Sequence, residues 1–115
     1  MTNYQPNLDH TFHALADATR RRVLERLMLG PASVKDLAAP FQMALPSFLQ
    51  HMKVLERSAL VRSVKNGRVR TFQIEPQQMQ NATHWLHAQL EMWERRLDQL
   101  DAYLKELATA EGENE

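Results

Sequence analysis

Cysteine is absent from this 115-residue chain, which excludes disulfide bonds, thiolate metal ligands and cysteine nucleophiles. Glycine is scarce, at three residues, and no glycine-rich phosphate loop or paired carboxylates in an evident cleft suggest an enzyme. No apolar run approaches the roughly 18 residues that a membrane-spanning helix needs. The N-terminus lacks the basic and then apolar segments of a secretory signal. We therefore expect a cytoplasmic protein without catalytic activity.

Net charge is also absent, because 14 Lys and Arg balance 14 Asp and Glu. The charges are nevertheless segregated along the chain. Residues 18–74 contain 11 Lys and Arg against 3 Asp and Glu, whereas the remaining residues contain 3 against 11. This segregation indicates that one face meets an anion while another part has a separate role; the alternative is chance clustering.

Apolar periodicity predicts a mainly α-helical fold with a small β-hairpin, in one domain over residues 1–115. Helices are expected over residues 8–16, 18–29, 34–39 and about 76–107. Asp17 and Ser33 occupy positions from which they would cap the second and third helices. Gly30 and Pro31 end the second helix, since glycine tolerates a positive φ and proline cannot continue a helix.

A further helix is predicted in the segment "MALPSFLQHMKVLERSALV", residues 43–61. One face is apolar and contains Leu45, Phe48, Leu49, Met52 and Leu55. We expect Leu49, Met52 and Leu55 to pack this helix against the second and third helices. The opposite face contains Pro46, Ser47, Gln50, Lys53 and Arg57. Pro46 suits the start of a helix because its φ is preset. This outer face is uncharged at its start and basic at its end.

After this helix the apolar period changes from helical to alternating. "LVRSVK" and "RVRTFQI" flank Asn66-Gly67, a pair that favours a hairpin with a type I′ turn. Two helices within about 33–57, followed by a basic hairpin within about 60–74, predict a winged helix-turn-helix.

In that fold the second helix of the motif enters the DNA major groove, N-terminal residues first. Ser47 and Gln50 would then hydrogen-bond base edges, whereas His51, Lys53 and Arg57 would reach phosphates. The hairpin would follow the backbone or the minor groove through Arg62, Lys65, Arg68 and Arg70. The alternatives are a core helix with a solvated outer face and a hairpin whose charges only keep its edges soluble.

The last helix has a long apolar stripe that a domain of this size cannot cover. Its predicted 30 residues would span about 45 Å. We expect a homodimer interface made by this helix together with the first one. The interface residues would be Leu8, Phe12, Leu15, Leu86, Leu90, Trp93, Leu97, Leu100 and Leu104. The acidic tail, about 108–115, is expected to be disordered.

Three motifs together resemble the ArsR/SmtB family of bacterial winged-helix repressors: "LADATRRRVLERL", "HMKVLERSALV" and "KNGRVRTFQI". The resemblance covers about residues 8–105. It implies a dimer that pairs its first and last helices and binds pseudo-palindromic operators, with Ser47, Gln50 and His51 on the recognition helix and Arg68 on the wing. Two departures stand out, since the family commonly has Ser or Thr at Leu49 and glycine at Ala59.

Arg20, Arg21 and Arg22 belong to the first of these motifs. For Arg20 and Arg22 we expect salt bridges or cap support within the second helix. For Arg21, solvent exposure and a phosphate contact are equally compatible with the sequence.

Many members of this family sense metals, which makes histidine pairs at a spacing of three relevant. His10 with His13, and His84 with His87, would converge if the first and last helices met. The family's interfacial site, however, mixes His with acidic residues at a wider spacing that this chain does not match. We expect no metal or cofactor. A His-based metal-responsive repressor, and an interaction module with non-specific nucleic-acid affinity, are the alternatives. A small-molecule effector is compatible with the sequence but not identified by it.

Overall fold

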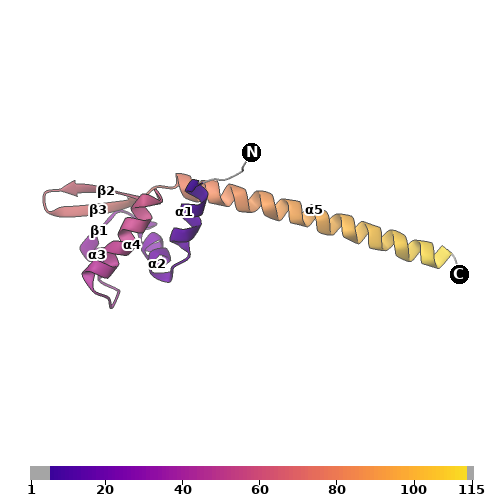
Figure 1. The fold of residues 1–115 in the computed structure, drawn as a ribbon, viewed down its shortest axis with the longest axis horizontal. Coiled ribbons are helices and arrows are strands. Elements are labelled where there is room, and N and C mark those ends of the chain that lie inside the picture. Colours follow the sequence, from indigo (N-terminus) through magenta and orange to yellow (C-terminus); the bar gives the residue numbers. More distant parts are fainter. Residues whose placement is uncertain (1–5, 114–115) are drawn as a thin grey trace. The chain divides into compact units, whose positions relative to one another are not determined.

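The computed structural model describes residues 6–113, which form five helices and a three-stranded sheet (Figure 1). The elements in chain order are α1 (Pro6–Leu15), α2 (Ala18–Leu27), β1 (Ala32–Ser33), α3 (Val34–Ala38), α4 (Leu45–Arg57), β2 (Val61–Asn66), β3 (Val69–Ile74) and α5 (Gln77–Glu113). The predicted fold class, mainly α with a small β-hairpin and a long C-terminal helix, is confirmed.

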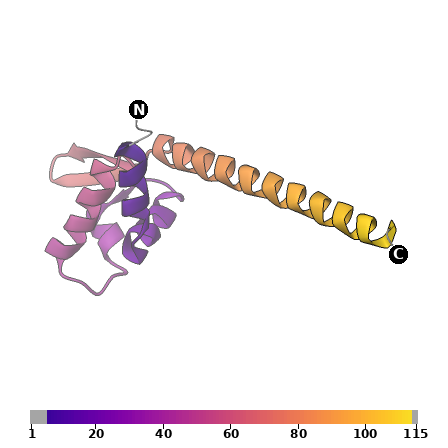
Figure 2. The same ribbon diagram turned by 45° about the vertical axis from the view of Figure 1, so that its right-hand side comes forward.

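The chain consists of two compact units, Met1–Ala82 and Thr83–Glu115. We call them the winged-helix unit and the helical unit. Their boundary falls inside α5, and each unit is described by itself. Figure 2 shows the helical unit as an uninterrupted helix.

Both predicted helix caps are present. Asp17 has an extended backbone, and its carboxylate accepts a hydrogen bond from the backbone N–H of Arg20 at 3.0 Å. Ser33 does the same for α3, with its hydroxyl accepting from the N–H of Asp36 at 3.2 Å. These bonds satisfy donors that the first helical turn leaves unpaired, so α2 and α3 begin where the sequence predicts.

The core of the winged-helix unit lies where α2, α3 and α4 meet the sheet. Its buried residues include Val23, Leu24, Leu27, Leu37, Phe48, Met52, Leu55, Leu60, Val61 and Phe72. Leu45 and Leu49 belong to the predicted apolar face of α4 but are 53% and 37% exposed, so the expectation that Leu49 packs against the preceding helices was wrong. Both lie on the flank of the helix, so only the Phe48, Met52 and Leu55 row reaches the core.

The sheet has strand order β1-β3-β2, one strand more than the predicted hairpin. The short β1 pairs with β3 through Ala32 opposite Phe72. The turn of the hairpin also differs from the prediction. Asn66 pairs with Val69, so the two loop residues are Gly67 and Arg68, and Gly67 takes the positive φ of 65°. Glycine at the first loop position is the arrangement of a type II′ turn rather than type I′.

The last helix continues past the predicted end. α5 runs to Glu113, so the disordered tail expected from residue 108 is wrong for residues 108–113. Ala108, Ala110 and the long side chains around them favour helix, and the helix propensity of such a run exceeds its tendency to disorder. None of the helices in the described range, α5 included, combines the length and apolar character that a membrane crossing requires.

Candidate nucleic-acid interface

The outer face of α4 is polar and open to solvent. Five of its six predicted contact residues are exposed, whereas His51 is half-buried; the exposed ones are Pro46, Ser47, Gln50, Lys53 and Arg57. Proline occupies the first turn of the helix, and Ala44 before it makes no side-chain cap. The buried row on the opposite side fixes the helix against the core, so the polar row has one orientation relative to the sheet. Side chains that can hydrogen-bond base edges therefore stand at the N-terminal end of an exposed helix.

The predicted wing residues separate into a tip and a base. Arg68 lies in the two-residue loop at the tip, and Lys65 lies directly opposite Arg70 on the adjoining strands, so these two share a face. Arg62 lies at the other end of the hairpin, where its Nε donates to Glu75 at 2.8 Å. The hairpin thus brings Lys65, Arg68 and Arg70 together and leaves Arg62 apart from them.

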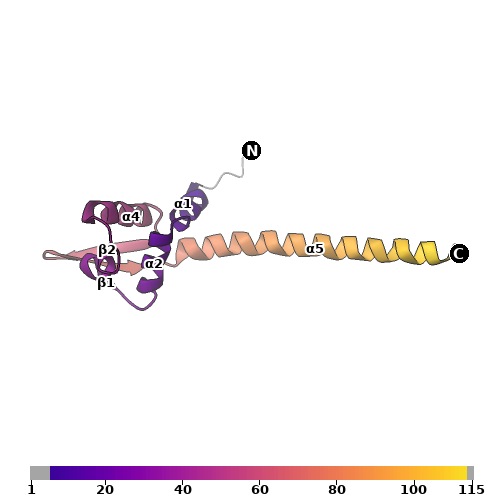
Figure 3. The same ribbon diagram turned by 90° about the horizontal axis from the view of Figure 1, so that it is seen from below.

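The wing is joined to α4 by a short chain of hydrogen bonds. Arg70 donates from Nη1 to the hydroxyl of Ser63 at 2.8 Å, and that hydroxyl donates to Glu56 of α4 at 3.1 Å. Figure 3 shows α4 beside the hairpin, and α4 contacts β2. Glu56 therefore links α4 to the wing through the hydroxyl of Ser63.

A groove of about 750 Å³ lies between α3, the start of α4 and the wing. Its lining residues are Ser33, Val34, Lys35, Ala38, Ala39, Phe41, Leu45, Arg68, Val69 and Arg70. Three of them are cationic and none is acidic. Lys35 was not among the predicted contact residues, because its distance in sequence from the wing hides the fact that it lines the same groove as Arg68. We call this feature the α3–wing groove.

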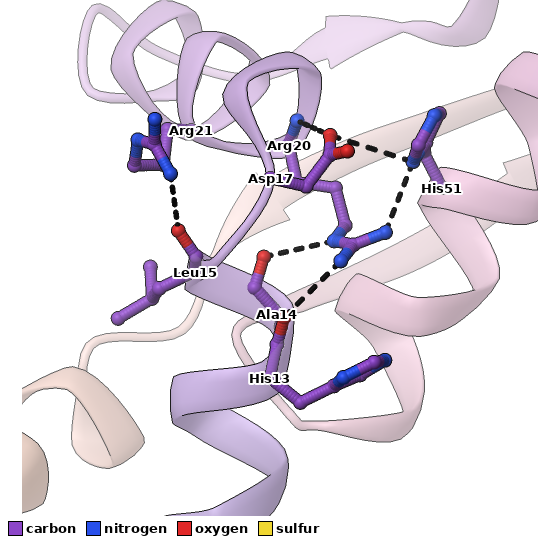
Figure 4. A network of polar contacts seen from close by, with 7 residues as sticks. All are labelled: His13, Ala14, Leu15, Asp17, Arg20, Arg21 and His51. Carbon is purple, nitrogen blue, oxygen red and sulfur yellow. Dashed lines mark hydrogen bonds and ion pairs between the residues drawn. The ribbon is translucent and has the colours of Figure 1, made fainter.

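His51 belongs first to an intramolecular network that the sequence analysis did not predict (Figure 4). Arg20 approaches Nδ1 of His51 at 3.1 Å and also donates to the backbone carbonyls of Ala14 at 2.8 Å and His13 at 3.1 Å. Because a guanidinium can only donate, Nδ1 of His51 is the acceptor in its contact with Arg20. Arg20 therefore ties the end of α1 to α4.

Asp17 lies at the edge of the same network, 3.7 Å from Nδ1 of His51. The backbone N–H of Arg20 lowers the pKa of the Asp17 carboxyl below its ordinary value of 3.8, against an opposing effect of burial. The side chains of His51 and Arg20 act in the same direction as that backbone bond. The carboxylate is therefore charged at neutral pH.

The three arginines at the start of α2 have separate roles. The predicted cap support is present for Arg20, but it serves the C-terminal end of α1 rather than α2 itself. Arg21 is exposed, as one of its two expected alternatives required, and it donates to the carbonyl of Leu15 at 2.7 Å. Arg22 lies over the ring of Phe41, 4.8 Å from its centroid, and not in the expected salt bridge. This cation–π contact steadies the loop between α3 and α4.

The histidine pairs form no metal centre within the described residues. In residues 6–113, no three His, Asp or Glu side chains are placed to hold one ion. His10 and His13 line a small cavity of about 240 Å³ with Val54, Arg57 and Ser58. His87 contacts Glu91 of its own helix at 3.2 Å.

The helical unit exposes every described side chain from Thr83 to Gly112. The predicted interface residues of this helix are among them: Leu86, Leu90, Trp93, Leu97, Leu100 and Leu104, all between 45% and 58% exposed. On α1 the predicted partners Leu8, Phe12 and Leu15 are half-buried instead. Leu15 packs against the core of the winged-helix unit.

These features define a winged helix-turn-helix protein, and comparisons with known proteins agree. Residues 15–64 match the model of a family described as a helix-turn-helix domain. The chain is 41% identical over 68 residues to the HTH-type transcriptional regulator Rv2034 of Mycobacterium tuberculosis, across 59% of this chain and 64% of that regulator. It is 24% identical over 79 residues to the transcriptional repressor SdpR of Bacillus subtilis, across 69% and 88% respectively.

A solved structure extends the match over most of the chain. The crystal structure of the ArsR family transcriptional regulator RHA00566 has 51% sequence identity and a TM-score of 0.77, covering 82% of this chain and 97% of that one. The chain belongs to the ArsR family of transcriptional regulators. The family predicted from the three sequence motifs is therefore confirmed.

Proposed function

We propose that the protein is a homodimeric repressor that binds a pseudo-palindromic DNA operator. The observation that carries this proposal is the exposed polar row of α4 beside the cationic α3–wing groove. Ser47 and Gln50 would read bases in the major groove, and Lys53 would contact phosphate. Arg68 at the wing tip would follow the backbone or enter the minor groove.

The dimer part of the proposal rests on the helical unit. Seven apolar residues, Leu86, Leu90, Trp93, Leu97, Leu100, Leu104 and Leu107, follow one another at alternating spacings of four and three. This spacing keeps them on one side of a helix, and a second copy presents the same stripe. Two-fold pairing also matches an operator with two half-sites. Repression, rather than activation, is proposed because SdpR, one of the relatives, is a transcriptional repressor.

Selection of bound duplexes from a random pool tests specific binding directly. We expect one enriched sequence with two related half-sites about one helical turn, or a multiple of it, apart. Gln50→Ala should weaken binding to this duplex by about 1–3 kcal/mol and affect random DNA much less. Equal affinity for the selected and random duplexes would leave only a non-specific nucleic-acid module.

Arg68→Ala provides the matched comparison, since it removes charge without removing a base contact. It should lower the affinity for the selected duplex and for random DNA by more similar factors than Gln50→Ala does. It should also make the log–log salt dependence shallower, by about one unit for each phosphate that the protein no longer neutralises. The change would be nearer two units if both wings of a dimer engage phosphate. An unchanged salt slope would show that the wing tip does not contact the backbone.

A further inference from the structure

Two leucines are exposed on the helix proposed to enter the major groove. Leu45 and Leu49 are one turn apart, so they lie on the same flank of α4. Their side chains are 53% and 37% exposed, while Phe48 and Met52 beside them are buried. Leu45 also lines the α3–wing groove, together with Phe41 and Val69. The apolar flank therefore adjoins the surface that the basic wing bounds.

The surroundings of these leucines indicate what would cover them. Lys53 follows Leu49 by one turn, and the cationic side chains of the α3–wing groove adjoin Leu45. A surface with this charge attracts a polyanion, and a duplex presents apolar atoms of two kinds to an inserted helix. These are the 5-methyl group of thymine in the major groove and the carbons of deoxyribose. Only the first of them carries sequence information.

We propose that Leu49, extended by Leu45, forms an apolar contact surface for the 5-methyl group of thymine. Each operator half-site then has a required thymine beside the bases read by Gln50. The methyl group is proposed rather than the sugar because Leu49 borders the exposed row that contains Gln50. Its helical neighbours Pro46, three residues before it, and Lys53, four residues after it, both belong to that row. This inference rests on the proposed function, and its test is separable from the test of that function.

Deoxyuridine lacks only the 5-methyl group, so it removes the proposed ligand and leaves the Watson–Crick pair intact. In the duplex selected from the random pool, each thymine is replaced in turn by deoxyuridine. Burial of one methyl-sized group corresponds to about a fourfold change in affinity. The wild-type protein should bind about fourfold more weakly after replacement at one thymine of a half-site, and about 15-fold more weakly when both half-sites are changed.

Three variants assign the effect to the leucine. Leu49→Ser should bind the thymine duplex as weakly as the wild type binds the deoxyuridine duplex, with less than a twofold further weakening on deoxyuridine. Leu49→Met keeps an apolar side chain, so its affinity should still fall when thymine is replaced by deoxyuridine. Leu29→Ser changes a leucine that is 83% exposed outside this flank and should behave as the wild type. Unfolding midpoints of the four proteins verify that each is folded.

Three results would overturn the inference. In the first, replacing thymine by deoxyuridine changes the affinity at no position. In the second, Leu49→Ser loses as much affinity on deoxyuridine replacement as the wild type does. In the third, Leu49→Ser lowers the affinity for selected and random duplexes equally, as the loss of a sugar contact would. Each of them leaves specific binding intact, so the proposed function survives. If selection enriches no sequence, the proposed function fails and the inference fails with it.

Discussion

The winged-helix unit and the helical unit have equally regular apolar patterns, but these patterns lead to different outcomes. In α2 and α4 most of the periodic residues are buried in the core: Val23, Leu24 and Leu27 in α2, and Phe48, Met52 and Leu55 in α4. In the helical unit every described side chain from Thr83 to Gly112 is exposed, including the leucine stripe. Periodicity therefore identifies the face of a helix that needs cover, and the partner that covers it has to be inferred from the rest of the molecule.

The two units also differ in charge. The winged-helix unit contains the basic segment 18–74, whereas the helical unit contains three Lys and Arg among many acidic residues. An acidic helix is repelled by DNA and a basic groove attracts it. Under the proposed function, this division would leave the leucine stripe available for a protein partner while the wing contacts the polyanion.

The largest expected effect comes from placing charge on the stripe. Leu97→Glu with Leu100→Glu should convert a dimer into a monomer and lower the affinity for a two-half-site duplex by orders of magnitude, because each monomer binds one half-site alone. Sedimentation at micromolar concentration should show a dimer for the wild type and a monomer for the variant.

The matched control adds the same charge to the opposite face of the same helix. Ala102→Glu with Thr109→Glu should remain dimeric and bind DNA, since neither residue lies on the stripe. If the wild-type protein sedimented as a monomer, the prediction that a second copy covers the leucine stripe would be wrong.

A smaller effect is expected where the winged-helix unit joins its helices. Arg20→Ala removes bonds to α1 and α4 and leaves the carbonyls of His13 and Ala14 without this donor. The free energy of unfolding should fall by about 2 kcal/mol in urea titration, because hydrogen bonds from charged donors are the stronger class. Arg21→Ala removes one exposed bond and should cost less than half as much. Equal effects of the two variants would mean that the network does not join the helices.

The sequence was sufficient for features that depend on local chemistry. Caps at Asp17 and Ser33, the helix of residues 45–57 and the hairpin all follow from residues within a few positions of one another. Wherever long-range placement decided the result, the sequence was insufficient. It did not predict β1, which exists only by pairing with β3, or the contact of Arg20 with His51, 31 residues away.

The candidate site shows the same limit. The polar row of α4 could be predicted because helical spacing alone defines it. The burial of Leu49 was predicted wrongly, since its position on the flank depends on where the core lies. Lys35 in the α3–wing groove could not be predicted, because only the folded sheet brings α3 next to the wing. The proposed roles of all these residues in DNA binding stay predictions.

The cap at Asp17 should contribute about 1 kcal/mol, so Asp17→Ala should lower the free energy of unfolding by that amount at pH 7. The pKa of this carboxyl is lower in the folded state, so its charge stabilises the fold above pH 3.8 and that contribution disappears as the pH falls through the folded-state pKa. Asp17→Asn keeps a capping oxygen without the charge. Its difference from the wild type in urea titrations should shrink as the pH falls below the ordinary value of 3.8 and through the lower folded-state pKa; a constant difference would exclude a role for the charge.

The smallest expected effect is a gain at the end of α4. Ala59 has a φ of 58°, the left-handed region that disfavours side chains with a β-carbon. Its N–H donates to Glu56 and that of Leu60 donates to Leu55, both at 3.0 Å, which is the Schellman pattern that usually has glycine at this position.

Ala59→Gly therefore removes a strain of about 1–2 kcal/mol and adds about 0.4–1 kcal/mol of unfolded-state entropy, for a net gain of about 0.5–1 kcal/mol. The same substitution in the helical unit should act in the opposite direction. Ala102→Gly lies in the interior of a regular helix and should cost about 1 kcal/mol. Urea midpoints of the two variants against the wild type give both signs in one experiment. If Ala59→Gly lowered the midpoint as Ala102→Gly does, the positive φ would not be a source of strain, and the end of α4 would obey the same rule as the middle of α5.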